Sequence, residues 1–335
     1  MKLVIQIPCL NEAEHLPGTL LTLPRAVPGF DTVEWLVVDD GSTDNTSGVA
    51  RLYGVDHVVR LPYNQGLARA FMAGIEAALR AGADVIVNTD ADNQYDAACI
   101  PDLVAPILAG RAQIVVGARP IDEIAHFSLV KRKLQRLGSF VVRMASGTDI
   151  EDAASGFRAI HRSAAQRLYV FNDFTYTLET IIQAGRKNIP TASVPIRVNG
   201  ETRPSRLFKS ITAYVTRSMS VILRIALLYR PLAVFASLAA LIALPGLIAI
   251  ARFLYFYATG DARGHIQSLA IAGVLVSVAA VVFVGGLLAD LIAANRMLLE
   301  DLRARHMAES LERTESARQN SETAFETPKS FVRRG

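Results

Sequence analysis

The chain has 335 residues, of which 51% are hydrophobic and 20% charged, and its mean hydropathy is +0.29. This apolar content excludes an intrinsically disordered chain, and the length allows one large domain or two smaller ones. A formal net charge of +4 is too small to indicate nucleic-acid binding, so no nucleic-acid partner is expected. Cys9 and Cys99 lack metal-ligand spacing, which predicts two buried free thiols in a reducing compartment.

Residues 1–120 alternate short β-rich runs with longer segments of helical periodicity. Strands are predicted at residues 3–7, 33–38, 57–60, 84–88 and 113–116, and the helices between them include residues 67–80 and 99–108. Regular alternation predicts an α/β fold with a mostly parallel sheet covered on both faces. Residues 154–198 add a strand, helices and a last strand at 193–198. Ligands of such sheets bind beyond the carboxyl ends of the strands, so the site is expected there.

Two apolar stretches, residues 231–251 and 266–289, carry no formally charged side chain. Each can cross a hydrocarbon core of about 30 Å at about 1.5 Å per residue. Residues 205–229 have the pattern of a basic amphipathic helix at the headgroups of a lipid bilayer. Basic residues at both ends of the hairpin predict a multi-pass protein of the cytoplasmic membrane with both termini in the cytoplasm. The expected division is a soluble domain 1–203, a juxtamembrane helix 204–229, a transmembrane hairpin 230–296 and a charged, partly disordered tail 297–335.

The strongest local signal is a pair of acidic residues, Asp90 and Asp92, directly after the predicted strand 84–88. In extended backbone, residues two apart face the same way, so both carboxylates can converge on one cation. Mg²⁺ or Mn²⁺ favours such oxygen ligands and commonly shares its coordination shell with a diphosphate. Taken alone, the motif is equally compatible with a solvated turn, and its place at a strand exit favours the metal site.

Two more strand exits carry polar or acidic residues. Asp40 follows strand 33–38 and is suited to accept hydrogen bonds from a nucleobase or ribose, while Ser42, Thr43 or Asp44 can cap the next helix. Residues 8–12 follow the first strand and include Glu12. Because the carboxyl ends of parallel strands meet at one edge, the three exits predict a single site. Dinucleotide, P-loop, zinc and serine-hydrolase motifs are absent from the sequence.

The order and spacing of four motifs resemble those of family 2 inverting glycosyltransferases of GT-A fold: Pro8-Cys9-Leu10-Asn11-Glu12, Val38-Asp39-Asp40-Gly41-Ser42-Thr43-Asp44, Asn64-Gln65-Gly66 and Asp90-Ala91-Asp92-Asn93-Gln94. Two further motifs narrow the resemblance to polyprenyl-phosphate glycosyltransferases, the bacterial relatives of dolichyl-phosphate mannose synthase: Ser155-Gly156-Phe157-Arg158 and Arg203-Pro204-Ser205-Arg206-Leu207. The chain therefore resembles a glycosyltransferase with a GT-A, Rossmann-like domain.

The resemblance assigns roles to individual residues. The implied metal ligands for Mg²⁺ or Mn²⁺ are Asp90 and Asp92, and Asp92 and Arg119 match catalytic positions. The residues implied to bind the donor are Pro8, Leu10, Glu12, Val38, Asp40, Asp90, Ala91, Asp92, Gln94, Arg119, Ser205 and Arg206. Those implied to receive the acceptor phosphate are Lys131, Arg132, Arg136 and Ser139. Leu10 stands where many relatives have Tyr, Asn93 replaces a common Gly, and Arg158 is expected to form a structural ion pair.

The implied reaction moves one sugar, with inversion, from a UDP- or GDP-sugar to an undecaprenyl-type phosphate at the cytoplasmic face of the bilayer. A phosphate acceptor is largely ionised at neutral pH, so it needs positioning by Arg or Lys rather than a general base. Relatives form tetramers, so a homotetramer is a further expectation. Two alternatives stay open: a hydroxyl acceptor on a glycolipid or glycan, which needs an additional carboxylate as base, and a non-catalytic membrane scaffold that binds a nucleotide sugar.

Overall fold

The computed structural model describes residues 1–120, 138–140, 142–170, 176–199, 216, 220, 223–224, 226–259 and 266–326. The chain forms two compact units, and each is described by itself. The sheet unit comprises Met1–Val215 and Glu300–Gly335, and the hairpin unit comprises Thr216–Leu299.

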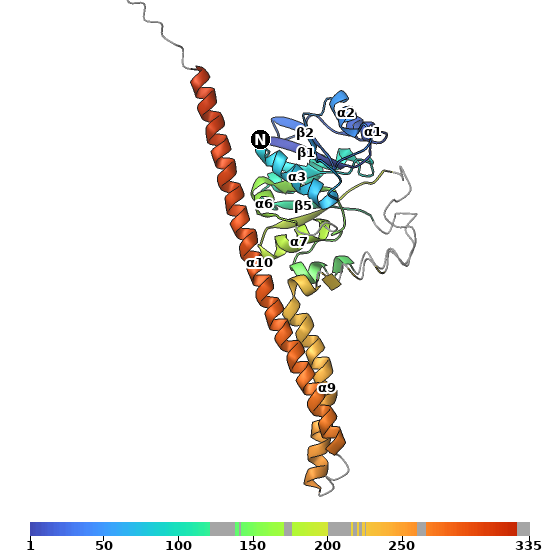
Figure 1. Ribbon diagram of the computed structural model, residues 1–335. Helices are drawn as coiled ribbons and strands as arrows, with labels where there is room; N and C mark the ends of the chain where they lie inside the picture. The colour runs from blue at the N-terminus through green and yellow to red at the C-terminus, as the bar shows by residue number, and fades with distance from the viewer. Residues whose placement is uncertain are drawn as a thin grey trace, which may run out of the picture. The chain divides into compact units, whose positions relative to one another are not determined.

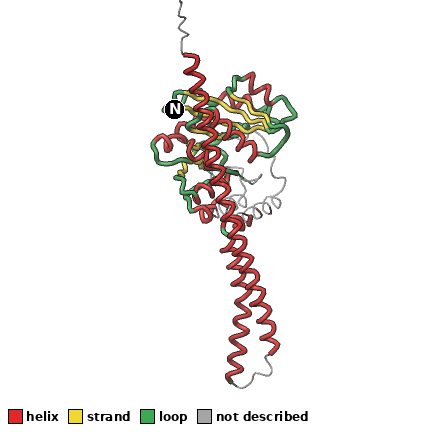
Figure 2. The backbone as a smooth tube through the Cα atoms, turned by 60° about the vertical axis from the view of Figure 1, so that its left-hand side comes forward, coloured by secondary structure: helices red, strands yellow, loops and turns green. Residues whose placement is uncertain are grey.

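The sheet unit is built on a seven-stranded sheet of order β3-β2-β1-β4-β6-β5-β7 (Figures 1 and 2). Its strands are β1 (Lys2–Cys9), β2 (Thr32–Asp39), β3 (His57–Arg60), β4 (Val85–Asn88), β5 (Ile114–Ala118), β6 (Arg158–His161) and β7 (Thr191–Pro195). Among these strands β6 is antiparallel to its neighbours β4 and β5, and the other neighbouring pairs are parallel. The predicted mostly parallel α/β sheet is confirmed. The carboxyl ends of β1, β2, β4 and β5 therefore share one edge with the start of β6.

Helices cover both faces of this sheet (Figure 2). They are α1 (Leu16–Thr22), α2 (Thr46–Leu52), α3 (Leu67–Arg80), the 3₁₀ turn η1 (Ala97–Cys99), α4 (Ile100–Leu108), α6 (Arg162–Arg167) and α7 (Tyr176–Arg186). Residues of β1 alternate between the faces: Leu3, Ile5 and Ile7 join the core cluster that also holds residues of α1 and α4. On the opposite face α3 approaches closely at Gly74, where an added Cβ would lie 2.5 Å from Gln6 Oε1.

Some elements have the predicted bounds, and others differ from them slightly. Helix α3 and strand β3 coincide with the predicted residues 67–80 and 57–60. The last strand ends at Pro195, and Val198 forms an isolated bridge with Tyr95 instead of continuing β7. This bridge carries the chain after β7 toward the segment that follows β4.

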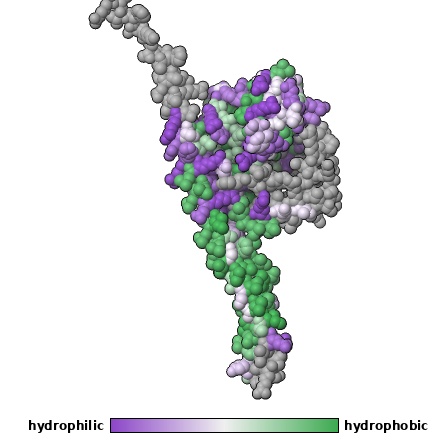
Figure 3. Space-filling view, viewed as in Figure 1, coloured by the Kyte–Doolittle hydropathy of each residue, from purple (hydrophilic) through white to green (hydrophobic). Residues whose placement is uncertain are grey.

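The hairpin unit contains α9 (Pro231–Ala258) and the first part of α10 (Ile266–Glu326). Both helices are long and apolar enough to cross a membrane. Gly246 lies against Ala272 and Leu275, and Gly286 lies against Phe235, so small residues permit close helix contact. Large apolar side chains face outward and make this surface hydrophobic (Figure 3). The two helices are therefore candidate membrane spans. Of the predicted amphipathic helix, residues 216, 220, 223–224 and 226–229 are described and are helical, and the rest lie outside the described residues.

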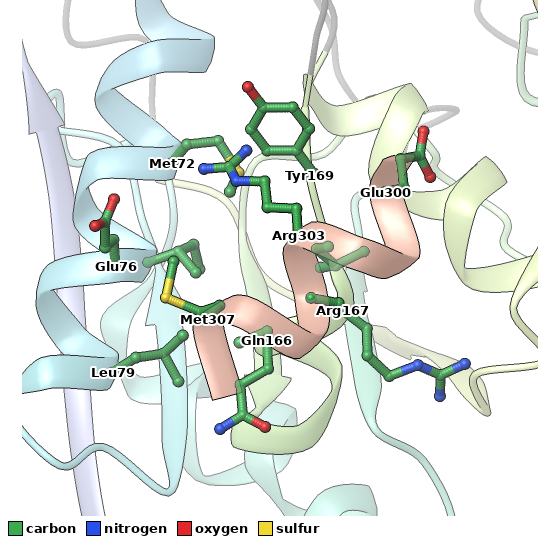
Figure 4. A pocket seen from close by; sticks show the side chains of 13 residues that line it. Met72, Glu76, Leu79, Gln166, Arg167, Tyr169, Glu300, Arg303 and Met307 are labelled. Carbon is green, nitrogen blue, oxygen red and sulfur yellow. The ribbon is translucent and has the colours of Figure 1, made fainter. Parts of the chain in front are cut away.

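Helix α10 continues past residue 296, where the hairpin was expected to end, as far as Glu326. The physical reason lies in its sequence: neither Gly nor Pro occurs between residues 287 and 327, and charges of alternating sign at Asp301, Arg305 and Glu309 are four residues apart. From Glu300 onward α10 belongs to the sheet unit. There Arg303 lies over the Tyr169 ring, 3.3 Å from its centre (Figure 4). Much of the segment expected as a charged, partly disordered tail is thus helical.

Candidate active site

The segments after β1, β2 and β4 lie side by side at the carboxyl edge of the sheet. Asp40 donates its backbone N–H to the Cys9 carbonyl over 2.9 Å, and Thr89 donates to the Gln6 carbonyl over 3.1 Å. Several acidic residues lie near the Cys9 thiol at this edge of the sheet. Burial raises the pKa of the Cys9 thiol well above its usual value, and the nearby acids Glu12, Asp39, Asp44 and Asp90 raise it further. The predicted convergence of the three strand exits is confirmed.

Asp40 is buried and organises the loop that follows β3. Its carboxylate accepts hydrogen bonds from the backbone N–H groups of Gln65 at 2.7 Å and Gly66 at 2.9 Å. Burial raises the pKa of Asp40, and these two hydrogen bonds oppose that shift. Gly41 has a φ of +69°, and a Cβ there would lie 2.4 Å from the Tyr63 carbonyl carbon. Because each carboxylate oxygen has a second lone pair, Asp40 can hold this loop and still accept a hydrogen bond from a ligand.

The segment after β1 is anchored to the segment after β2 by side chains of the acidic motif. Asn11 donates its N–H to Ser42 Oγ over 2.9 Å, and Ala13 donates to Asp44 Oδ2 over 3.1 Å. Asp44 Oδ1 also accepts from the N–H of Thr46, the first residue of α2. The N-cap of α2 is Asn45, whose side chain makes no capping hydrogen bond, so the cap expected from Ser42, Thr43 or Asp44 lies one residue before the N-cap position. Two predicted donor-binding residues, Pro8 and Val38, are buried register partners in β1 and β2. Glu12 is 5% exposed, and Leu10 is half-buried.

The acidic segment after β4 forms a tight turn. Asp92 is 9% exposed, and its Oδ1 accepts the N–H of Gln94 over 3.2 Å. Asn93 has a φ of +55°, a left-handed conformation that glycine and asparagine adopt most readily. Ala91 is buried, and its carbonyl accepts a hydrogen bond from Thr19 Oγ1 over 2.7 Å. The turn is therefore held in one conformation by hydrogen bonds and by the choice of Asn at its left-handed position.

Arg119 leaves β5 at the same edge and is fixed by a carboxylate. Its Nε and Nη2 atoms donate to Asp152 over 2.6 and 3.1 Å, and the two side chains are 16% and 1% exposed. Burial lowers the pKa of Arg119, but Tyr95, Asp152 and Asp90 raise it by more, so the guanidinium stays charged near Asp90. Sequence reasoning missed Asp152. Its place just before the Ser155-Gly156-Phe157-Arg158 motif was the available signal.

The Ser155-Gly156-Phe157-Arg158 motif at the start of β6 packs against residues on either side of the acidic turn. Gly156 donates its N–H to Tyr95 Oη over 3.0 Å, and its carbonyl accepts from Asn88 Nδ2 over 2.8 Å. Arg158 is fully buried and donates to the carbonyls of Ser155 and Ala153. The structural role predicted for Arg158 therefore holds, whereas the predicted ion pair is replaced by hydrogen bonds to neutral acceptors. Burial lowers the pKa of Arg158 to about 10.

Sequence reasoning also missed two buried tyrosines, Tyr95 and Tyr176. Tyr95 stacks on Phe157 with ring centroids 5.1 Å apart, and Tyr176 stacks on Phe71 at 4.4 Å. Burial raises the pKa of Tyr95 to about 12, and the Asp90 charge adds to that shift. The pKa of Tyr176 is raised by the same two causes. Both hydroxyls therefore keep their protons at neutral pH and remain able to donate hydrogen bonds.

Comparisons with known proteins identify the family of the chain. The family model described as glycosyl transferase family 2 matches residues 4–169, which contain the acidic turn and the strand exits. The chain belongs to glycosyl transferase family 2. It is thus a glycosyltransferase, as predicted.

Named relatives of this glycosyltransferase include two enzymes of lipid-linked sugar transfer. The undecaprenyl-phosphate mannosyltransferase of Micrococcus luteus is 33% identical over 165 residues, which are 48% of this chain and 66% of that protein. The polyprenol monophosphomannose synthase of Mycolicibacterium smegmatis is 31% identical over 172 residues, or 49% of this chain and 63% of that protein. The matches thus span slightly less than two thirds of both relatives.

A solved structure shares the fold of this glycosyltransferase. Glucosyl-3-phosphoglycerate synthase from Mycobacterium tuberculosis, crystallised with Mn²⁺, UDP and phosphoglyceric acid, superposes with a TM-score of 0.52. The match has 19% sequence identity and covers 68% of this chain and 77% of that one. Together with the sheet topology, it shows the GT-A-like fold that the motifs predicted.

Some predicted site residues of the glycosyltransferase lie outside the described residues: Lys131, Arg132, Arg136, Ser205 and Arg206. Ser139, the remaining member of the acceptor-phosphate set, is described and is 6% exposed. The pocket in Figure 4 lies elsewhere, between α3, α6 and α10, and none of its lining residues belongs to the strand-exit segments. The candidate active site therefore consists of the carboxyl edge of the sheet, from Glu12 to the Arg119–Asp152 pair.

Asp90 and Asp92 of the glycosyltransferase fit a hard divalent cation by the chemistry of their oxygen atoms. Among the residues that the structure describes, no group of three or more His, Cys, Asp or Glu side chains is placed to hold a metal ion. A cation bound by the two aspartates would therefore take further ligands from a phosphate or water. Such a cation would also reduce the repulsion between an anionic ligand and the carboxylates of this edge.

Proposed function

We propose that this glycosyltransferase transfers a single sugar from a UDP- or GDP-sugar to a polyprenyl phosphate at the cytoplasmic face of a membrane, with inversion. The observation that carries the proposal is the charge arrangement at the carboxyl edge: the buried Arg119–Asp152 pair lies near Asp90 in the acidic turn. This combination suits a diphosphate bridged by a cation. The two candidate membrane spans and the lipid-phosphate transferases among the relatives support a lipid acceptor.

The donor would lie along the edge from β2 to β5. Asp40, Glu12 and the buried pair Pro8 and Val38 would line the nucleotide, with Leu10 beside them. Asp90 and Asp92, with the Ala91 and Gln94 backbone between and after them, would hold Mg²⁺ or Mn²⁺. Such a cation supplies neutralisation of the charge that develops on the leaving diphosphate.

Arg119 would act as a second positive charge facing the same phosphates. Asp152 fixes its guanidinium through two hydrogen bonds, so little reorganisation is needed when the diphosphate leaves. This prior fixation is what makes a charged hydrogen-bond donor effective in a partly buried site. Asp92 and Arg119 are thus the proposed catalytic residues.

The acceptor phosphate would be positioned by Lys131, Arg132, Arg136 and Ser139, and Ser205 and Arg206 would close over the nucleotide. A phosphate that is ionised at neutral pH attacks the anomeric carbon directly as the sugar–diphosphate bond breaks, which inverts that carbon. We also propose the division into a catalytic domain 1–203, a juxtamembrane helix 204–229 and a hairpin from residue 230, with both termini in the cytoplasm and a homotetrameric assembly.

The test uses full-length protein in liposomes that contain undecaprenyl phosphate. A panel of labelled UDP- and GDP-sugars is supplied with Mg²⁺ or Mn²⁺, and labelled lipid is measured after extraction. One donor should give a lipid-linked sugar, and Asp92→Asn should reduce the rate by about 100-fold or more. Asp149→Asn, at an exposed position, is the matched control.

Three results would contradict the proposal. Product formed on diacylglycerol but not on the lipid phosphate would indicate a hydroxyl acceptor. Tight binding of UDP or GDP without turnover would indicate a scaffold. Equal rates for wild type and Asp92→Asn would exclude the acidic turn from the reaction.

A further inference from the structure

Gly156 lies directly against the carboxylate of Asp90. A Cβ added to Gly156 would lie 3.2 and 3.3 Å from the two carboxylate oxygens of Asp90, and 3.0 Å from the Tyr176 hydroxyl oxygen. Real Cβ atoms rarely make contacts this short, so a methyl group would push on both neighbours. The backbone φ of Gly156 lies outside the left-handed region, so the lack of space for a Cβ, rather than the backbone conformation, requires a glycine here.

Gly156 is held on both sides by buried side chains. Its N–H donates to Tyr95 Oη over 3.0 Å, and its carbonyl accepts from Asn88 Nδ2 over 2.8 Å. Asn88 is itself fixed, because Gln6 Nε2 donates to its Oδ1 over 2.8 Å. Asn88 is fully buried, and Tyr95 is 5% exposed. The position of the Gly156 Cα is therefore set by the sheet core, independently of any ligand.

The two tyrosine hydroxyls beside Asp90 have protons available for it. Tyr95 Oη accepts from Gly156, and Tyr176 Oη accepts from Asn88 Nδ2 at 3.4 Å, so the proton of each hydroxyl can be given to a third group. The Tyr176 hydroxyl and the Asp90 carboxylate surround the same point, because a Cβ added to Gly156 would lie within 3.3 Å of both groups. The ring of Tyr176 is held in turn by stacking on Phe71.

We propose that Gly156 is a positioning residue whose bare Cα supports the Asp90 carboxylate, while the neighbouring Tyr176 hydroxyl helps to hold that carboxylate in place for the cation of the donor complex. This inference rests on the proposed function, because it assigns Asp90 to a cation. Gly156 makes no contact with the ligand itself and acts through Asp90. Altering a group that supports a metal ligand typically changes metal affinity by about 10–100-fold.

The experiment measures Mn²⁺ binding to the full-length protein in detergent, with GDP or UDP present, from the electron paramagnetic resonance signal of free Mn²⁺. Gly156→Ala should raise the Mn²⁺ dissociation constant about tenfold or more. Tyr176→Phe, which adds no atoms, should raise it in the same direction. Gly18→Ala is the matched control, because Gly18 is exposed and nothing lies within 4 Å of its added Cβ.

A double-mutant comparison separates positioning from a general structural effect. In an Asp90→Asn background, Gly156→Ala should add less than about twofold to the dissociation constant, because the group through which it acts is already altered. An undiminished effect in that background would overturn the inference. The inference also fails if a folded Gly156→Ala protein binds Mn²⁺ as tightly as wild type.

Further outcomes are also decisive. If Gly156→Ala does not fold, Tyr176→Phe decides: an unchanged dissociation constant overturns the inference, and a raised one supports it. If wild type and Asp92→Asn bind Mn²⁺ equally, the proposed function fails and the inference fails with it. If Asp92→Asn loses Mn²⁺ but Gly156→Ala does not, the inference fails alone.

Discussion

Replacing Asp152 by Asn should strongly destabilise the sheet unit, because it removes the charge that compensates Arg119. Asp152 is 1% exposed and the Arg119 side chain is 16% exposed, so water solvates the remaining guanidinium poorly. Loss of one partner of a buried ion pair typically costs about 3–5 kcal/mol. Since Asp90 lies near enough to raise the pKa of Arg119, it offsets part of that loss, and we expect about 3 kcal/mol.

The assay is urea unfolding in detergent, followed by the fluorescence of Trp35. This residue is the single tryptophan of the chain and is 7% exposed in the core of the sheet unit. A loss of about 3 kcal/mol corresponds to a melting temperature lowered by roughly 6–12 °C for a domain of this size. Asp149→Asn, at an exposed position, should change stability by less than about 0.5 kcal/mol. An Asp152→Asn protein as stable as wild type would refute the reasoning.

Three other predictions concern single side chains. Burial and nearby acids raise the pKa of the Cys9 thiol, so its thiolate fraction at pH 8 is small. Mass spectrometry should therefore find Cys9 alkylated only after the protein is unfolded, and rapid alkylation of the native protein would contradict this. Glu300→Gln should cost about 3 kcal/mol, because its pair with Lys187 at 3.2 Å is buried, and an unchanged urea midpoint would argue against α10 packing here. Burial raises the pKa of Asp56, but hydrogen bonds from a backbone N–H and an arginine lower it by more, so the pKa in the folded state lies below the unfolded value. The Asp56 carboxylate therefore contributes its full stabilisation above the unfolded pKa, and this contribution is lost as the pH falls through the folded pKa. The difference in urea midpoint between wild type and Asp56→Asn should therefore shrink between pH 7 and pH 2.5, and a constant difference would contradict this.

The parallel part of the fold could be read from the sequence because its signals are local. Helix α3 and strand β3 begin and end at the predicted residues, since amphipathic and β-branched patterns mark them. The orientation of β6 is different: an antiparallel strand between β4 and β5 leaves no local pattern. The extension of α10 was missed because a charged segment is typical of both solvated tails and helices with alternating charges.

The candidate site divides in the same way. Asp90, Asp92 and Asp40 could be predicted, because acidic residues after buried strands have recognisable spacing. Asp152 and Tyr176 could not, because their importance comes from contacts with residues far away in the sequence. For Arg158 a structural role could be predicted from its place after Gly156 and Phe157, but the choice of carbonyl acceptors over a carboxylate depends on the path of the backbone around it.

The central claim is that Asp90 and Asp92 hold a donor through a divalent cation. Its most direct measurement is the melting temperature, followed by Trp35 fluorescence, with each nucleotide sugar in the presence and absence of Mn²⁺. At a ligand concentration about 100 times the dissociation constant, binding should stabilise the wild type by about 2.7 kcal/mol, only with Mn²⁺, and leave Asp92→Asn unchanged. Equal stabilisation of both proteins, or stabilisation that is the same without Mn²⁺, would contradict the account.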